Sequence, residues 1–343
     1  MRVLITGHLG YIGVEMTSYL ADLGHDVVGL DTDLYAECDF LAPPDPVPAL
    51  DIDLRDVCVA DLLGFDAVIH LAALSNDPLA DLNPLLTYAI NRDASIRLAE
   101  TAKAAGVRRF LFASSCSLYG RGGDEELHEG AAFNPVTPYG ESKVDVERAL
   151  SALADDTFSP VYLRNATAYG VSRRLRADVL VNNLVGLAMT SGMVVMQSDG
   201  SPWRPLVHIL DIARAFAQAL VVPRDVVHNQ AFNVGRVGEN YRVREVADLV
   251  AAVLPGVSVS CAPGATPDIR DYRVDFGKIH RAMPAYRPQW TVRQGIEQLC
   301  AAYARSGLTA DDFAGPRYFR LRTVQQLIDR GDVDLELRQV ARR

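Results

Sequence analysis

The feature that most constrains the fold is a glycine pattern near the N-terminus, Gly7-His8-Leu9-Gly10-Tyr11-Ile12-Gly13. It lies between an apolar, β-branched run at residues 2–6, which predicts a strand, and a helical pattern at residues 11–23. Glycines with this spacing allow a tight turn, a close approach of the backbone to a pyrophosphate, and close packing of helix on sheet. An ordinary glycine-rich turn is the alternative. We predict a dinucleotide site with cofactor contacts at Gly7, Leu9, Gly10, Tyr11, Ile12 and Gly13.

An acidic residue, Asp31, ends the next predicted strand at residues 27–30. A carboxylate in this position accepts hydrogen bonds from the ribose hydroxyls and repels a 2′-phosphate, so NAD is favoured over NADP. The alternative is a capping role, and Asp33 competes for the ribose. Further along, Asp53 and Leu54 follow another short strand and are expected near the adenine.

Strand-like and helical segments alternate over the first half of the chain. This alternation predicts an α/β fold, a Rossmann-like doubly wound parallel sheet with helices on both faces. The further strands are expected at residues 67–71, 110–113 and 161–163, and the helices between them at 84–105 and 139–153.

Beyond Arg164 the rhythm changes, and Gly, Pro and Arg become frequent. We predict an NAD-binding domain at residues 1–164, with about 206–235 returning to it as a helix and a strand. A smaller C-terminal substrate-binding lobe is expected at 165–205 and 236–310. An extension at 311–343 includes a helical pattern at 323–329, but its role is not readable.

Composition excludes several classes of protein. With 49% apolar residues the chain is not mainly disordered, and a net charge of −9 argues against nucleic acid or an anionic membrane as a partner. The five cysteines are widely spaced, which predicts neither a metal site nor disulfides and fits the cytoplasm. No apolar run reaches the length of about 18 residues that would predict a membrane span.

A catalytic pair is predicted on the helix at residues 139–153, where Tyr139 and Lys143 are four residues apart. Positions i and i+4 share one helix face, so the phenol and the ammonium belong to one site. The Lys143 charge favours the phenolate, which then removes a proton from a substrate hydroxyl. A chance pair on a solvated helix is the alternative.

A run of hydroxyls, Ser114-Ser115-Cys116-Ser117, follows the strand at 110–113. Open α/β sheets bind ligands at the carboxyl ends of their strands, so Ser115 is expected to hydrogen-bond the reacting oxygen beside Tyr139. Without the tyrosine–lysine pair, a simple serine-rich turn would be preferred.

Together these residues resemble an extended short-chain dehydrogenase/reductase of the NAD-dependent epimerase/dehydratase family, most of whose members act on nucleotide sugars. The resemblance covers about residues 1–300 and includes the glycine pattern, the Tyr139–Lys143 pair and Arg204 through Asp211. It implies NAD as the cofactor, a nucleotide-diphosphate sugar as the substrate and a homodimer. It adds cofactor contacts at Leu71, Ala72, Ala73, Asn91, Tyr139 and Lys143.

Within this family, the residues after Ser115 separate the reactions. Sugar dehydratases and related decarboxylases carry a Glu where this chain has Ser117, and a serine cannot replace that carboxylate. Some epimerases use a cysteine at the same position. Here Cys116 comes one residue earlier, points to the other side of a strand, and is interpreted as a small buried residue rather than a catalytic thiol.

The favoured reaction is therefore C4 epimerisation through a transient 4-keto sugar. The alternative is an NAD(P)H-dependent 4-keto-sugar reductase. A dehydratase or decarboxylase is less favoured. So is a non-catalytic NAD(P)-sensing relative, because relatives of that kind have lost the catalytic tyrosine that this chain keeps as Tyr139.

The resemblance also implies a set of substrate contacts. Arg204 matches an arginine that meets the diphosphate, and Arg270 or Arg273 is a candidate for a second phosphate contact unless both are surface charges. Thr167 stands where relatives carry Asn, with Asn165 two residues earlier, so we expect the sugar or its orientation to differ from that of the commonest members. The substrate-side set is Ser75, Ser115, Cys116, Ser117, Thr167, Asn183, Leu184, Arg204 and Arg273.

Overall fold

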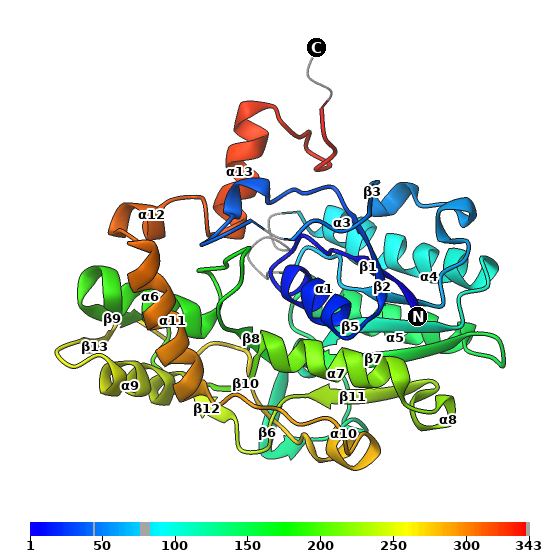
Figure 1. The fold of residues 1–343 in the computed structure, drawn as a ribbon. Coiled ribbons are helices and arrows are strands. Elements are labelled where there is room, and N and C mark those ends of the chain that lie inside the picture. Colours follow the sequence, from blue (N-terminus) through cyan, green and yellow to red (C-terminus); the bar gives the residue numbers. More distant parts are fainter. Residues whose placement is uncertain (44, 76–82, 341–343) are drawn as a thin grey trace.

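A computed structural model describes residues 1–43, 45–75 and 83–340. Its main element is a seven-stranded sheet in which every neighbouring pair of strands is parallel (Figure 1). This confirms the predicted doubly wound fold. The strand order is β11 (Gln230–Val234), β7 (Ser159–Asn165), β5 (Arg109–Ser115), β4 (Ala67–His70), β1 (Arg2–Thr6), β2 (Asp26–Asp31) and β3 (Ala49–Asp51).

Helices cover both faces of this sheet. Alternate residues of β1 face opposite ways, so Val3 and Ile5 pack in one core and Leu4 packs in the other. The first core is shared with α1 (Gly13–Asp22) and α7 (Ile209–Val221), and the second with α4 (Ala94–Ala104) and α5 (Pro138–Leu153).

The helical segment expected at 84–105 is interrupted. It begins as α3 (Pro84–Thr87), continues as a wider π-helical turn, η4 (Tyr88–Asp93), and then becomes α4. Within that turn, the buried Asn91 side chain accepts a hydrogen bond from Leu74 N–H at 2.8 Å and donates one to Leu74 C=O at 3.0 Å. The turn thus ties the helix to the segment after β4.

A second lobe packs beside the carboxyl ends of the large sheet, around its own apolar core. The chain returns from it to the large sheet through α7 and β11, joined by α8 (Arg224–Val227). The lobe contains two small sheets: β12 (Asn240–Arg242), β10 (Trp203–His208) and β8 (Thr167–Tyr169); β13 (Ser258–Cys261) and β9 (Met193–Met196). Its helices are α6 (Leu180–Ser191), α9 (Val243–Val253), α11 (Val292–Ser306) and α12 (Ala310–Ala314). A third small sheet, β14 (Asp271–Val274) and β6 (Arg121–Leu127), packs on the core of the large sheet through Tyr272 and Val274. The short helix α10 (Gly277–Ala282) lies against β11, with Ile279 in the core of the large sheet.

The last described residues, up to 340, lie beside the domain of the large sheet. The last helix, α13 (Arg320–Arg330), contains the predicted helical stretch and lies against the segment that follows β2, red against blue in Figure 1.

All five cysteines are free: Cys58 and Cys261 are exposed, while Cys38 and Cys116 are buried. Among the described residues, no group of His, Cys, Asp and Glu is placed to hold a metal ion. In the same part of the chain, no helix combines the length and the apolar character needed to cross a membrane.

Candidate functional site

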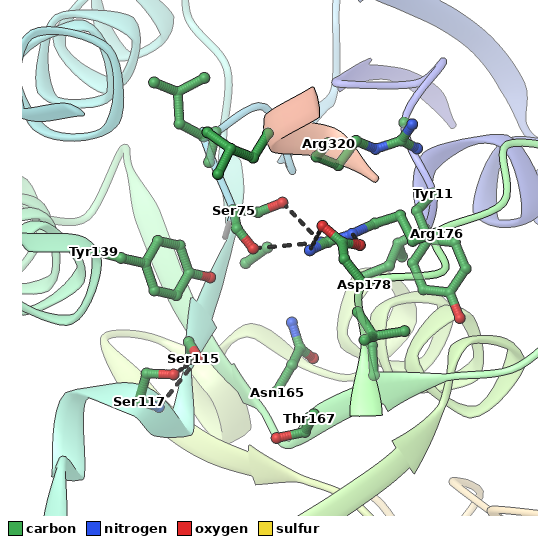
Figure 2. Close-up of a pocket in the computed structure, with 18 of the residues that line it drawn as sticks. Tyr11, Ser75, Ser115, Ser117, Tyr139, Asn165, Thr167, Arg176, Asp178 and Arg320 are labelled. Atoms are coloured by element: carbon green, nitrogen blue, oxygen red, sulfur yellow. Dashed lines mark hydrogen bonds and ion pairs between the residues drawn. The ribbon is translucent and has the colours of Figure 1, made fainter. Parts of the chain in front are cut away.

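A cavity of about 960 Å³ lies between the carboxyl ends of the large sheet and the second lobe. Most of the residues predicted for cofactor and substrate line it (Figure 2). These lining residues are Gly7, Leu9, Gly10, Tyr11, Ile12, Gly13, Asp31, Asp53, Leu54, Leu71, Ala72, Ala73, Ser75, Ser115, Ser117, Tyr139, Lys143, Thr167, Asn183, Leu184 and Arg204.

The glycine turn has no room for side chains. Gly7 has φ +74°, and its N–H donates to Leu30 C=O at 2.8 Å. A Cβ on Gly13 would lie 2.0 Å from Gly7 O, and one on Gly10 would lie 3.2 Å from the same atom. No side chain caps the N-terminus of α1, so this end of the helix is open toward the cavity. A cradle of this shape and polarity fits a dinucleotide diphosphate.

Asp31 stands at the end of β2, as expected. Its two oxygens accept hydrogen bonds from Leu9 N–H at 3.0 Å and Asp33 N–H at 3.1 Å, and its burial raises the pKa of the carboxyl group. The competing Asp33 instead forms an ion pair with Arg174 of the second lobe at 2.9 Å. Asp31 therefore stays the predicted ribose-side carboxylate. Asp53 lines the cavity while paired with Arg55 at 2.6 Å.

Tyr139 and Lys143 occupy the first turns of α5. Thr137 caps this helix by accepting a hydrogen bond from Gly140 N–H at 3.2 Å. Lys143 Nζ donates to Ala113 C=O at 2.8 Å and lies 5.4 Å from the centroid of the Tyr139 ring. Burial lowers the pKa of Lys143 to about 7, so its charge responds to small changes in the site.

The hydroxyl run faces the same space. Ser115 Oγ donates to Ser117 Oγ at 3.1 Å and accepts a hydrogen bond from Ser117 N–H at 3.1 Å. Figure 2 shows Tyr139 with its hydroxyl directed into the cavity, and Ser115 and Ser117 below it. A proton acceptor and a hydroxyl donor thus share one edge of the cavity, the arrangement needed to remove a proton from a sugar hydroxyl.

A buried ion pair lies behind the Tyr139 and Ser115 edge of the cavity, and it was not predicted from the sequence. Arg164 on β7 pairs with Glu147 on α5 at 2.7 Å, and Ser114 Oγ donates to Glu147 at 2.6 Å. The ion pair joins α5 to β7, and the Ser114 hydrogen bond joins α5 to β5. Both contacts fix the position of α5 and therefore of Tyr139. The signal was present in the sequence, because a charged residue within an apolar strand needs a buried partner.

Asn165, at the end of β7, also lines the cavity. Its amide is directed into the cavity in Figure 2, near Thr167. Nδ2 donates to Ser114 C=O at 3.3 Å, whereas the buried Oδ1 has no partner within the described chain. Because buried polar atoms are normally hydrogen-bonded, Asn165 Oδ1 is a candidate acceptor for a donor group on a ligand.

Two predictions are wrong in their detail. The interpretation of Cys116 as a small buried residue is confirmed, but its place in the substrate-side set is wrong, because it begins a tight turn that directs its side chain into the core. There Sγ donates to Arg164 C=O at 3.2 Å, and burial raises the pKa of the thiol. Asn91 was placed at the cofactor, but its side chain makes two hydrogen bonds to the backbone of Leu74 and does not line the cavity.

Arg273 is a third correction. It does not line the cavity and lies over the Trp203 ring, 5.1 Å from its centroid, because β14 presents it to that side. Arg270 does line the cavity, next to Arg204. Both arginines pair with Asp268, at 2.6 and 2.8 Å respectively, so the cationic end of the cavity is held in place by one carboxylate.

Further lining residues were not expected from the sequence. Arg176 pairs with Asp178 at 2.9 Å and donates to Ser75 Oγ at 3.2 Å, which joins the second lobe to the segment after β4. The C-terminal extension contributes Phe319, Arg320, Leu321, Arg322 and Leu337.

Comparison with known proteins decides the family. The NAD dependent epimerase/dehydratase family matches residues 3–235. The chain belongs to this family. It is similar to the UDP-glucose 4-epimerase of Mycolicibacterium smegmatis, with 29% identity over 86% of this chain and 96% of the relative. It is also similar to that of Bacillus subtilis, with 26% identity over 88% of this chain and 95% of the relative. The predicted resemblance and NAD as the cofactor are confirmed.

Solved structures agree with the fold. MoeE5 in complex with UDP-glucose and NAD superimposes with a TM-score of 0.77, at 27% identity over 90% of this chain and 100% of that chain. Other family members differ in reaction, since a UDP-glucuronic acid decarboxylase of Arabidopsis thaliana is 24% identical over 92% of this chain and 72% of the relative. The protein is thus an enzyme of the NAD-dependent epimerase/dehydratase family.

Proposed function

We propose that the protein is an NAD-dependent nucleotide-sugar 4-epimerase. The observation that carries the proposal is the Tyr139–Lys143 pair facing Ser115, with Ser117 where dehydratases and decarboxylases of the family carry a carboxylate. The site can thus move a proton to and from a sugar hydroxyl, but it has no acidic group at that position to eliminate water.

The chain's own residues define the proposed steps. Arg204 and Arg270 hold the diphosphate of the substrate, and Ser115 donates a hydrogen bond to the sugar 4-oxygen. Tyr139 takes the proton of the 4-hydroxyl, and the Lys143 charge stabilises the phenolate. Bound NAD⁺ supplies reversible hydride chemistry. After the 4-keto sugar turns over in the cavity, Tyr139 returns its proton to the opposite epimer.

The test is incubation of the holoenzyme with UDP-, dTDP- and GDP-hexoses without added cofactor, followed by proton NMR. Formation of the 4-epimer, with no net change in NADH absorbance, is the expected outcome. If no epimer forms but a 4-keto sugar is reduced at the expense of NADH or NADPH, the protein is a ketoreductase instead. The proposal also includes a cytoplasmic homodimer, whose mass light scattering measures.

A further inference from the structure

The last part of the chain, residues 316–340, builds one wall of the cofactor side of the cavity. We call this segment the C-terminal cover. It lies beyond the region matched by the family, which ends at residue 235. Leu337 reaches the cavity beside Asp53, Leu54 and Arg55, the part expected to hold the adenine.

Polar contacts fasten the cover to the segments after β2 and β3. Arg338 pairs with Asp56 at 2.5 Å, and Gln339 Nε2 donates to Thr32 C=O at 2.6 Å. In the reverse direction, Arg55 Nη1 donates to Glu336 C=O at 2.9 Å. Since Thr32 follows Asp31 directly, these contacts surround the adenosine end of the predicted dinucleotide site.

Apolar contacts fasten the cover to the segment after β4. Val324, Val333 and Leu337 form a small buried core with Leu74. Leu74 follows the predicted cofactor contacts Leu71, Ala72 and Ala73, and its backbone is held by Asn91. The cover therefore packs on three segments that bound the cofactor side of the cavity.

Arg320 carries a buried positive charge at this wall. Only 3% of the residue is exposed, its guanidinium stacks on the Tyr35 ring at 4.0 Å, and Nη2 donates to Arg174 C=O at 3.2 Å. Nη1 is buried without a partner, and no ion pair with a carboxylate is seen for Arg320 within residues 1–43, 45–75 and 83–340. Arg320 and Arg176 appear on the same side of the cavity in Figure 2, but Arg176 is paired with Asp178 at 2.9 Å. Arg320 is therefore the cation of this wall that a negatively charged group on a ligand could pair with.

We propose that the C-terminal cover retains the cofactor. It encloses the adenosine half of NAD, and NAD leaves only when the contacts of the cover open. The inference rests on the proposed function in one respect: an epimerase returns its hydride to the substrate, so it gains from a cofactor that does not exchange between turnovers.

The test measures the release of NAD rather than turnover. Holoenzyme loaded with radiolabelled NAD⁺ is mixed with excess unlabelled NAD⁺, and the bound label is followed by rapid filtration. The double variant Arg338→Ala/Gln339→Ala removes the Gln339 contact with Thr32 and the ion pairs of the partly exposed Arg338 with Asp56 and, at 3.9 Å, with Asp53. In this variant we expect release to be roughly tenfold faster. The matched control is Arg244→Ala, which breaks an exposed ion pair with Asp248 at 3.0 Å on α9 and should release NAD at the parental rate.

A second variant, Leu337→Asp, places a charge in the apolar contact between the cover and the adenine side. It should release NAD at least as fast as the double variant, with its folding checked by circular dichroism. Parental release rates in both folded variants would overturn the proposal, as would rapid release from the parent. The two proposals fail separately: a parent without epimerase activity whose variants lose NAD faster supports retention and refutes the proposed reaction.

Discussion

At the scale of single residues, the phenol of Tyr139 has the most direct consequence. Tyr139→Phe keeps the ring, and with it the shape of the cavity, but removes the group that exchanges the proton. We expect epimerisation to fall by about 10²–10⁴-fold while NAD remains bound. The measurement is NMR turnover together with the NAD content of the purified protein. The control is Tyr88→Phe, which removes a half-buried phenol that donates to Glu141 on the same helix and does not line the cavity. Full activity in Tyr139→Phe would refute the mechanism.

A buried histidine makes stability depend on pH. His70 Nδ1 lies 2.7 Å from Thr6 Oγ1 and Nε2 lies 2.7 Å from Ser95 Oγ, and burial lowers the pKa of His70 to about 3. Below its ordinary pKa of 6.5, the unfolded chain binds a proton that the folded chain refuses. The free energy of unfolding therefore falls as the pH drops from 6.5 toward 3, by about 1.4 kcal/mol per pH unit for this group.

Urea unfolding at pH 7, 6 and 5 measures this slope. In His70→Gln the slope should be smaller than in the parent by about 1 kcal/mol per pH unit, whatever the change in absolute stability. His208, whose pKa burial lowers to about 4, contributes a similar slope of its own in both proteins. Equal slopes in the parent and the variant would show that His70 does not cause the effect.

At the scale of elements, two glycine substitutions in the turn between β1 and α1 should have different effects on stability and on NAD affinity. A Cβ on Gly13 meets backbone atoms of Gly7 and His8 at 2.0–2.8 Å, so Gly13→Ala should cost about 2–4 kcal/mol of stability. Gly10→Ala meets only Gly7 O, at 3.2 Å, and should cost less than about 1 kcal/mol. Gly10→Ala should still lose NAD affinity, because the added methyl group stands where the backbone approaches the pyrophosphate.

Urea unfolding of the cofactor-free proteins and NAD titration by fluorescence check both effects. The expectation is contradicted if the two variants are equally stable, or if Gly10→Ala binds NAD like the parent.

The sequence predicted elements best where the pattern is local. The strands of the large sheet and the helices α1, α5 and α7 follow from apolar periodicity and glycine ends. The strand β6 was missed, because Arg121–Leu127 contains two glycines and three acidic residues and reads as a loop. Its partner β14 lies almost 150 residues further along the chain, and only that long-range pairing makes β6 a strand.

At the scale of the whole molecule, cofactor binding between the sheet and the second lobe should stabilise the folded chain. A ligand that binds only the folded state adds about 2.7 kcal/mol at a concentration 100 times its Kd. We expect the melting temperature of the cofactor-free protein to rise with the NAD⁺ concentration, and to rise less with NADP⁺, because Asp31 repels a 2′-phosphate. Differential scanning fluorimetry with both cofactors tests this, and equal shifts would contradict the role of Asp31.

The candidate site could be predicted to the extent that its residues belong to short motifs. Gly7, Asp31, Ser115 and Tyr139 stand at strand ends or helix starts, where the fold itself directs them to one edge. The C-terminal cover has no such motif, and its place beside the cavity depends on tertiary contacts that no local pattern encodes. The errors have a related cause, since Arg273 and Cys116 lie next to true lining residues but point elsewhere.

The exposed cysteines, finally, allow the two lobes to be labelled with dyes without any substitution in the chain. Only Cys58 and Cys261 are exposed, the former in the first domain and the latter on β13 of the second lobe. Burial raises the pKa of the half-buried Cys300 and of the buried Cys38 and Cys116, which slows their alkylation. Brief maleimide treatment should therefore attach one dye to each lobe, and energy transfer between the dyes would report any change in the distance between the lobes as a sugar nucleotide binds.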